Sequence, residues 1–326
     1  MVIVFALAAA VLYGSADFLG GAATRQSRAL SVASLSVPAG AVVMLLAAVV
    51  AGGPLPTAGL GWALAAGAFG AIGLITFYNG LAAGPMSVVA PVSALVSTIV
   101  PVGVAVASGE RLGAPVYAGA AVCLVAIVLV SLEGGTRSRE TPARKAPARG
   151  GEIAGSEIPG GGIPARRAVG AARSHGPGGW ARYLGGHPAV RGFAYGIAAG
   201  TMFGVFFVFL RNAGTSGVFW PVCTARLANC AVVLGAAVIA GARPAGREAG
   251  ARVLVAATAS GVLDASANVF YVLATRAGLF GIAAVLTSLY PGITVLLARV
   301  VLRERMRAVQ RVGLLLAAAG VVLVTL

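Results

Sequence analysis

The chain has 326 residues, of which 59% are hydrophobic and only 10% are charged, and its mean hydropathy is +0.94. Because soluble domains carry roughly 25% charged residues, this composition excludes an ordinary soluble protein and predicts one that resides in a lipid bilayer. The net charge of +15 does not indicate nucleic-acid binding, since the basic residues are spread over loops and a linker without interleaved aromatic residues or a recognisable binding module.

Apolar segments of about 20 residues, long enough to cross a ~30 Å hydrocarbon core as helices, follow one another along most of the chain. The first of them contains Asp17, lacks a basic leading segment and is too long for the apolar core of a signal peptide, so we expect a retained helix. Ten segments are predicted, at about residues 2–23, 30–51, 60–83, 86–108, 114–132, 190–211, 217–241, 252–275, 279–302 and 309–326.

A stretch at residues 133–188 interrupts the apolar segments. It is rich in Gly, Pro, Ala and Arg and has no apolar periodicity, which is typical of a disordered linker. Both histidines, His175 and His187, lie in it, so we do not expect them to bind a metal. We therefore divide the chain into a first unit at residues 1–132, a disordered basic linker at 133–188 and a second unit at 189–326.

The two units repeat one another in sequence. Glu110 and Glu304 lie 194 residues apart, each is followed by arginine, and the same offset relates Gly84 to Gly278 and Gly119 to Gly313. Ordered self-similarity of this kind is typical of duplicated secondary transporters. The expected fold class is an all-α membrane protein with ten transmembrane helices arranged as two inverted five-helix repeats.

Enzyme motifs are absent from the sequence. It has no phosphate-binding loop, no nucleophile elbow and no zinc-binding His-Glu-x-x-His pair, and its three cysteines lie within apolar segments, where they are expected to be buried hydrophobic residues. No catalytic residue, metal or cofactor is predicted, and the chain is not expected to be an enzyme.

Three ionisable residues lie well inside predicted helices, namely Asp17, Arg226 and Asp264. Each such residue costs about 2.5–3.5 kcal/mol to insert and therefore requires a structural or functional reason. Arg211 and Arg299 lie near segment ends, where a long side chain reaches the membrane interface, so we give them less weight.

Helical spacing groups these residues with further polar ones. Tyr13 and Asp17 share one helix face, and Asp264, Asn268 and Tyr271 follow an i, i+4, i+7 stripe on another. A polar stripe in a membrane must face protein or water. Tyr78 and Asn79 lie in the third segment, and Tyr78 corresponds to Tyr271 in the second unit. All these residues are predicted to line a central cavity.

The roles of two residue pairs inside the predicted helices remain open. Arg226 and Asp264 form either a structural ion pair or an anchor for an anionic substrate group, and Tyr78 and Tyr271 are alternatively interfacial aromatic residues. If the pair forms, Asp17 is the membrane carboxylate without an obvious cationic partner. Because low dielectric disfavours the charged form of a carboxyl group, Asp17 is the predicted proton-coupling residue.

Several motifs resemble the EamA-domain proteins of the drug/metabolite transporter superfamily. These are the run Phe77-Tyr78-Asn79-Gly80-Leu81-Ala82, the segment from Pro91 through Ser97 to Gly109-Glu110-Arg111-Leu112, and the counterpart Ser288-Leu289-Tyr290-Pro291 leading to Arg303-Glu304-Arg305-Met306, Gln310, Gly313 and Gly320. The resemblance covers both units and implies a ten-helix transporter that binds its substrate centrally. The chain departs from the family in its long linker and in Ser97, which stands where the second unit has proline.

The predicted function is secondary active transport in the bacterial inner membrane, with proton-coupled export of a small metabolite, amino acid or drug-like solute. Its expected partners are the solute, protons and the lipid bilayer, with no nucleic acid. The alternative is a non-transporting membrane scaffold or sensor whose basic linker recruits a partner. The predicted substrate-binding residues are Tyr13, Tyr78, Asn79, Arg226, Asp264, Asn268 and Tyr271.

Overall fold

A computed structural model describes most of the chain outside the predicted linker. The described residues are 1–24, 26–53, 57–83, 86–111, 113–131, 188–214, 217–242, 250–301 and 308–325. They fold into α-helices and contain no β-strand. The two histidines and Glu304 lie outside the described residues, as does the predicted linker apart from its last residue, Pro188.

The helices fall close to the segments expected from apolar length. In the first unit they are α1 (Val2–Thr24), α2 (Ala29–Ala51), α3 (Leu60–Ala83), α4 (Met86–Ala107) and α5 (Ala114–Ser131). In the second unit they are α7 (Pro188–Ala213), α8 (Phe219–Ile239), α9 (Ala251–Ala277), α10 (Phe280–Thr287), α11 (Tyr290–Val301) and α12 (Ala308–Thr325). The one segment expected at 279–302 is thus two helices, which is the main difference from the sequence-based prediction.

Six helices are long and apolar enough to cross a bilayer, as judged over the described residues. They are α1, α2, Leu60–Phe77 of α3, Val190–Ala213 of α7, α8 and α9. Shorter apolar stretches occupy Val92–Ala107, Ala114–Leu129, Phe280–Thr294 and Arg311–Leu323. Large apolar side chains such as Val50 and Ile239 are 87% and 89% exposed. A large apolar exterior of this kind marks contact with lipid or with another protein, and together with the apolar helices it supports a multi-pass membrane protein.

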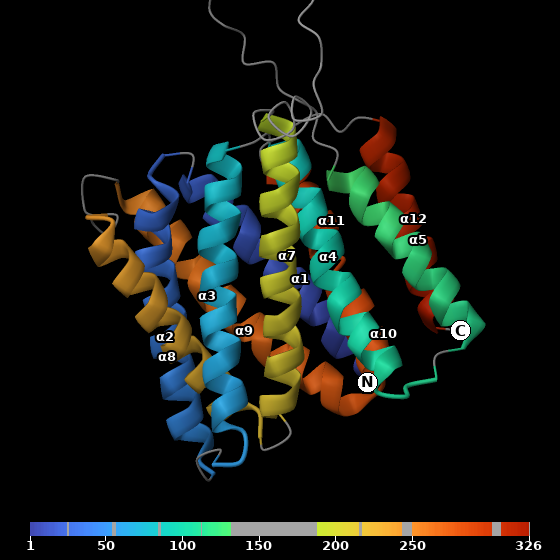
Figure 1. Cartoon of the computed structure of the whole chain (residues 1–326), viewed down its shortest axis with the longest axis horizontal. Coiled ribbons are helices and arrows are strands. Elements are labelled where there is room, and N and C mark those ends of the chain that lie inside the picture. The colour runs from blue at the N-terminus through green and yellow to red at the C-terminus, as the bar shows by residue number, and fades with distance from the viewer. Residues whose placement is uncertain are drawn as a thin grey trace, which may run out of the picture.

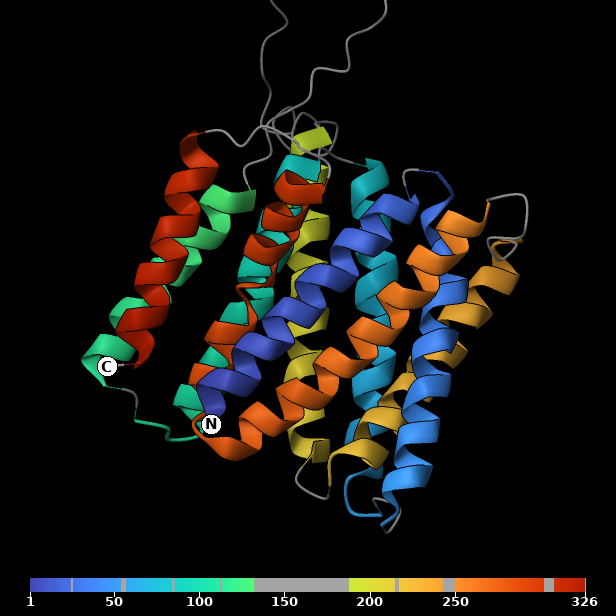
Figure 2. The same ribbon diagram turned by 180° about the vertical axis from the view of Figure 1, so that it is seen from behind.

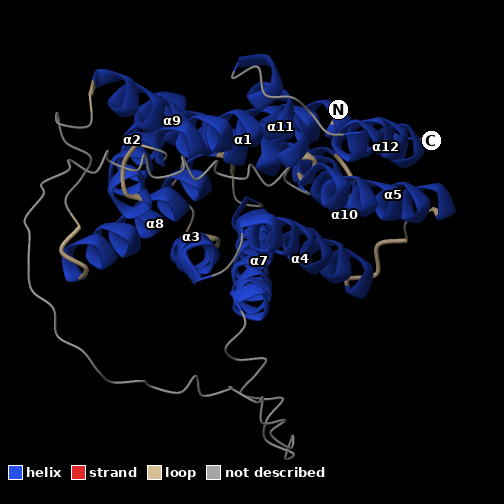
Figure 3. Cartoon of the chain, turned by 90° about the horizontal axis from the view of Figure 1, so that it is seen from above, coloured by secondary structure: helices blue, strands red, loops and turns tan. Residues whose placement is uncertain are grey.

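The helices of the two units are interleaved. Seen from above, α9, α1, α11 and α12 follow one another along one side, while α3, α7 and α4 lie on the other (Figure 3). α1 packs along α9, and α3 packs along α7 (Figures 1 and 2). α2 packs on α8 and α9, α3 also packs on α8, and α5 pairs with α12 at one edge.

The packing between the two units is reciprocal. The first helix of each unit packs on the third helix of the other, as α1 does on α9 and α7 does on α3. The second helices, α2 and α8, pack on each other, and so do the last helices, α5 and α12. Each unit therefore finds most of its helix partners in the other.

Two glycines permit the closest crossings between the units. A Cβ atom on Gly67 of α3 would overlap the carbonyl oxygen of Ala225 on α8, and one on Gly261 of α9 would overlap the carbonyl oxygen of Ser36 on α2. The two glycines are 194 residues apart, the offset of the sequence repeat. Helices in lipid pack through small residues because apolar burial gives them no driving force.

We expect Gly67→Ala and Gly261→Ala each to destabilise the folded protein by about 1–3 kcal/mol, because the new methyl group forces two backbones apart. The matched control is Gly235→Ala in α8, where a Cβ meets nothing within 4 Å and helix propensity favours alanine. Melting temperatures in detergent report the effect. Equal melting temperatures for Gly67→Ala and Gly235→Ala would contradict the predicted close crossing.

Candidate functional site

The break between α10 and α11 lies among buried residues of the bundle. Ser288 and Leu289 separate the two helices, and both are buried. Pro291, the second residue of α11, has no N–H to donate, and it disfavours helical geometry at the residue before it. Broken helices are tolerated at membrane depth only where the backbone is enclosed by protein or lines a cavity, and in transporters they mark binding sites.

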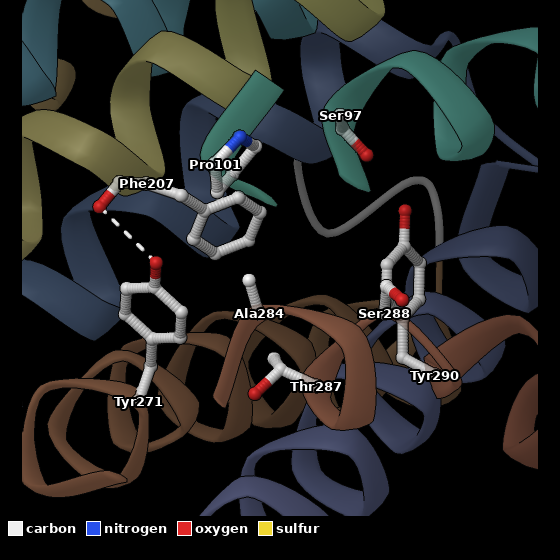
Figure 4. A pocket seen from close by; sticks show the side chains of 8 residues that line it. All are labelled: Ser97, Pro101, Phe207, Tyr271, Ala284, Thr287, Ser288 and Tyr290. Atoms are coloured by element: carbon white, nitrogen blue, oxygen red, sulfur yellow. Dashed lines mark hydrogen bonds between the residues drawn. The ribbon is translucent and has the colours of Figure 1, made fainter. Parts of the chain in front are cut away.

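A small pocket adjoins this break (Figure 4). Its walls come from α4, α7, α9, α10, α11 and the break itself, so both units contribute. The lining residues are Ser97, Pro101, Phe207, Tyr271, Ala284, Thr287, Ser288 and Tyr290. The Tyr290 ring reaches towards Ser97 across the pocket, and no charged side chain is among the lining residues.

Most of the pocket hydroxyls already donate their hydrogen to a backbone carbonyl. Ser97 donates to Ala94 O at 3.0 Å, Ser288 donates to Val285 O at 2.7 Å, and Tyr271 donates to Phe207 O at 3.2 Å. Thr287 differs from them, because it is only 2% exposed and its hydroxyl finds no partner among the described residues. Buried polar groups without partners are rare in native proteins.

An ion pair lies near the pocket, and Tyr13 of α1 stands between the two. The Arg226 guanidinium of α8 donates to the Asp264 carboxylate of α9. Asn268, one turn further along α9, donates its side-chain amide to Asp264 O at 2.8 Å and accepts the Tyr13 hydroxyl hydrogen. Arg226, Asn268 and Tyr13 are all buried, so this cluster connects α1, α8 and α9 through polar contacts.

Tyr13 connects the cluster to the pocket. Its ring lies 5.9 Å from the Phe207 ring and 6.1 Å from the Tyr290 ring, measured between centroids. Phe207 and Tyr290 both line the pocket, whereas the Tyr13 hydroxyl points to Asn268. One aromatic side chain therefore separates an uncharged pocket from a charged cluster.

Asp17 lies one turn from Tyr13 on α1. It interacts electrostatically with Asp264 and with Tyr290. Next to it, Ser260 of α9 donates to Ala16 O at 2.8 Å, which holds α1 and α9 together at this level. No cationic side chain among the described residues forms an ion pair with Asp17.

Five of the predicted binding residues come together in space, and Asp17 lies beside them. Tyr13, Arg226, Asp264 and Asn268 form the polar cluster, and Tyr271 lines the pocket. Asn79 is exposed on α3, which packs on α7 and α8 rather than on α1 or α9. The side chain of Tyr78 is outside the described part of the chain.

Sequence reasoning missed most of the pocket lining. Ser97, Phe207, Thr287, Ser288 and Tyr290 were not predicted as binding residues, since serine and threonine are common in membrane helices and carry no charge. The signal that could have identified them is Pro291, which follows two hydroxyl-bearing residues, Ser288 and Tyr290, inside an apolar segment. A proline there predicts a helix break, and hydroxyls at a break predict a polar pocket.

Glu110 of the first unit contacts the start of α10. It lies three residues beyond α4, and its two carboxylate oxygens accept the backbone N–H groups of Phe280 and Gly281 at 2.9 and 3.0 Å. Arg211 at the end of α7 lies 3.9 Å from the same carboxylate and stacks over the Phe280 ring at 4.6 Å. The first unit thus caps the N-terminus of α10 in the second unit.

We expect Glu110→Ala to lower the stability by about 1–2 kcal/mol, because two N–H groups at a helix start lose their acceptor. Arg211→Met should cost less than about 1 kcal/mol, since the ion pair is long and partly exposed. Thermal unfolding in detergent ranks the two changes. The control is Ser108→Ala, an exposed residue near Glu110. A larger loss for Arg211→Met than for Glu110→Ala would contradict the capping role.

The ion pair yields a second stability prediction. The Arg226 side chain is 8% accessible and that of Asp264 is 38% accessible in the isolated chain, so Asp264→Leu leaves the more buried charge uncompensated. We expect this change to cost about 3–5 kcal/mol, Arg226→Met to cost less, and the double variant to recover most of the loss. Thermal unfolding of all four proteins measures the coupling. Additive losses would contradict a structural pair.

Comparison with known proteins agrees with this architecture. Residues 190–326 match the EamA-like transporter family, which confirms the resemblance over the second unit. No curated protein matches the chain. Among 13 matching chains of solved structures, one crystal structure of a protein aligns over 99% of this chain and 96% of that chain, with 17% identity and a TM-score of 0.67. At that identity the likeness shows the fold alone.

Proposed function

We propose that this chain is a secondary active transporter of the bacterial inner membrane, which exports a small metabolite, amino acid or drug-like solute in exchange for protons. The matched family consists of membrane transporters and not of enzymes. The observation that carries the proposal is the polar cluster around Tyr13, which lies between helices of both units beside a pocket at a broken helix.

The proposal includes two inverted five-helix repeats, with α10 and α11 counted as one broken helix. The reciprocal packing of α1 on α9 and of α7 on α3 supports it. The equivalent glycine crossings at Gly67 and Gly261 support it as well. Inverted repeats place a substrate site near the middle of the membrane at the interface between them, and this agrees with a pocket and a charged cluster that both lie between helices of the two units.

The balance of charge supports proton coupling. Asp17 and Asp264 supply two negative charges when both are ionised, and Arg226 supplies one positive charge. A net negative charge in a medium of low dielectric is costly, so Asp17 and the cluster together favour binding one proton or one cation. Asp264 is held by Arg226, which leaves Asp17 as the proposed proton carrier. Tyr13, Arg226, Asp264, Asn268 and Tyr271 are the proposed contacts of the solute.

Asp17→Asn should abolish proton-driven accumulation while leaving solute exchange partly intact, because asparagine keeps the size and polarity of the side chain but cannot carry the proton. Proteoliposomes with an imposed pH gradient measure accumulation, and counterflow without a gradient measures exchange. The counterflow signal is the internal control for folding and insertion.

Wild-type accumulation by the Asp17→Asn protein would refute the carrier role. Failure of the unmodified protein to move any solute in counterflow, across amino acids, nucleosides, sugars and cationic drugs, would instead favour the non-transporting scaffold or sensor.

A further inference from the structure

The pocket at the break between α10 and α11 offers acceptors and few donors. Ser97, Ser288 and Tyr271 each have a single hydroxyl hydrogen, and each gives it to a backbone carbonyl. Their remaining capacity is as acceptors through oxygen lone pairs. The Thr287 hydroxyl is buried without a partner and can donate or accept, and the Tyr290 hydroxyl is hydrogen-bonded with Ser97. Because three of the five hydroxyls that line the pocket can only accept, a ligand with N–H or O–H donors of its own fits the pocket best.

The electrostatics of the pocket favour a cation over a neutral donor. Ala284 and Thr287 lie in the last turn of α10, where the helix dipole places partial negative charge. Asp17 and Asp264 interact electrostatically with Tyr290 at the opposite wall. The rings of Phe207 and Tyr271, whose centroids are 4.8 Å apart, present π faces that attract cations. Arg211 also interacts electrostatically with Tyr271, but its charge lies beside the Glu110 carboxylate, so these features together disfavour an anion.

The size of the pocket limits which cation fits. Its interior has room for about one water molecule, which is close to the size of an –NH₃⁺ group. A quaternary ammonium group is larger and has no N–H to donate.

We propose that this pocket binds the ammonium group of a protonated primary amine, and that solutes carrying such a group are the substrate class. The inference rests on the proposed transport function and specifies what the same site recognises. The ammonium hydrogens would point to the hydroxyl oxygens of Thr287, Ser288 and Ser97.

Binding of three matched probes to the purified full-length protein tests the proposal. The probes are protonated benzylamine, benzyltrimethylammonium and benzyl alcohol, which share the ring and differ in charge and donors. A ligand that binds the folded state raises the melting temperature by mass action. We expect benzylamine to bind about tenfold or more tightly than either of the others, which corresponds to one charge-assisted hydrogen bond. Equal affinity for benzylamine and either other probe would overturn the proposal.

Substitutions at Thr287 locate the binding. Thr287→Val keeps the shape and removes the hydroxyl, so it should weaken benzylamine binding about tenfold, while Thr287→Ser should retain it. The matched control is Thr98→Val on α4, since Thr98 is equally buried, donates to Ala94 O at 2.8 Å and does not line this pocket. Unchanged binding by a folded Thr287→Val protein, or equal loss in Thr98→Val, would overturn the assignment.

These measurements use detergent solution without a pH gradient, so they are separate from the coupling experiment. Normal accumulation by Asp17→Asn proteoliposomes would refute proton carriage by Asp17 and leave amine binding unaffected. Equal binding of the three probes would refute ammonium recognition alone, even where proton-driven transport of another solute is measured.

Discussion

Lipid offers no hydrogen-bond partner to a polar group, so the polar groups in the membrane interior of this chain depend on partners within the protein. That constraint explains where the described polar contacts lie. Arg226 pairs with Asp264, Asn268 joins Tyr13 to α9, and the Glu110 carboxylate accepts the first N–H groups of α10. Each of these contacts connects different helices, so the polar groups that cost most to insert also fix how the helices pack.

The same constraint separates the interior into two chemically different parts. The cluster of Arg226, Asp264 and Asn268 holds formal charges that largely compensate one another. The pocket beyond Tyr13 holds hydroxyls and aromatic rings without a formal charge. Neither Asp17 nor Asp264 lines the pocket. Their carboxylates act on it electrostatically from outside, so the pocket lining itself is uncharged.

The sequence predicted the helices well because apolar length is a local property. The limits of α1, α2 and α3 lie within one residue of the predicted segments. Helical spacing also grouped Tyr13 with Asp17 on one helix and Asp264 with Asn268 on another, and the hydrogen bond from Tyr13 to Asn268 joins these two faces. Its grouping of Asn79 with them stays a prediction, because the packing of α3 on α7 and α8 is a tertiary property that helical spacing within one helix does not specify. The sequence did not identify Thr287 as a binding residue either. Its buried hydroxyl points to a binding site only because it has no hydrogen-bond partner among the described residues, and that depends on tertiary packing.

The broken helix has a mechanical consequence. α10 is fastened at its start to Glu110 of the first unit, whereas α11 is fastened to α1 where the Thr294 hydroxyl donates to Gly14 O at 3.1 Å. The start of α10 is therefore held by the end of α4 and α11 is held by α1, and between them the Leu289 N–H donates to Leu286 O at 3.3 Å, which departs from the α-helical pattern. We expect a displacement of the end of α4 relative to α1 to bend the chain at this joint, because the helical hydrogen bonding is interrupted there. Since Ser288 is itself a wall of the pocket, the pocket changes shape whenever the joint bends.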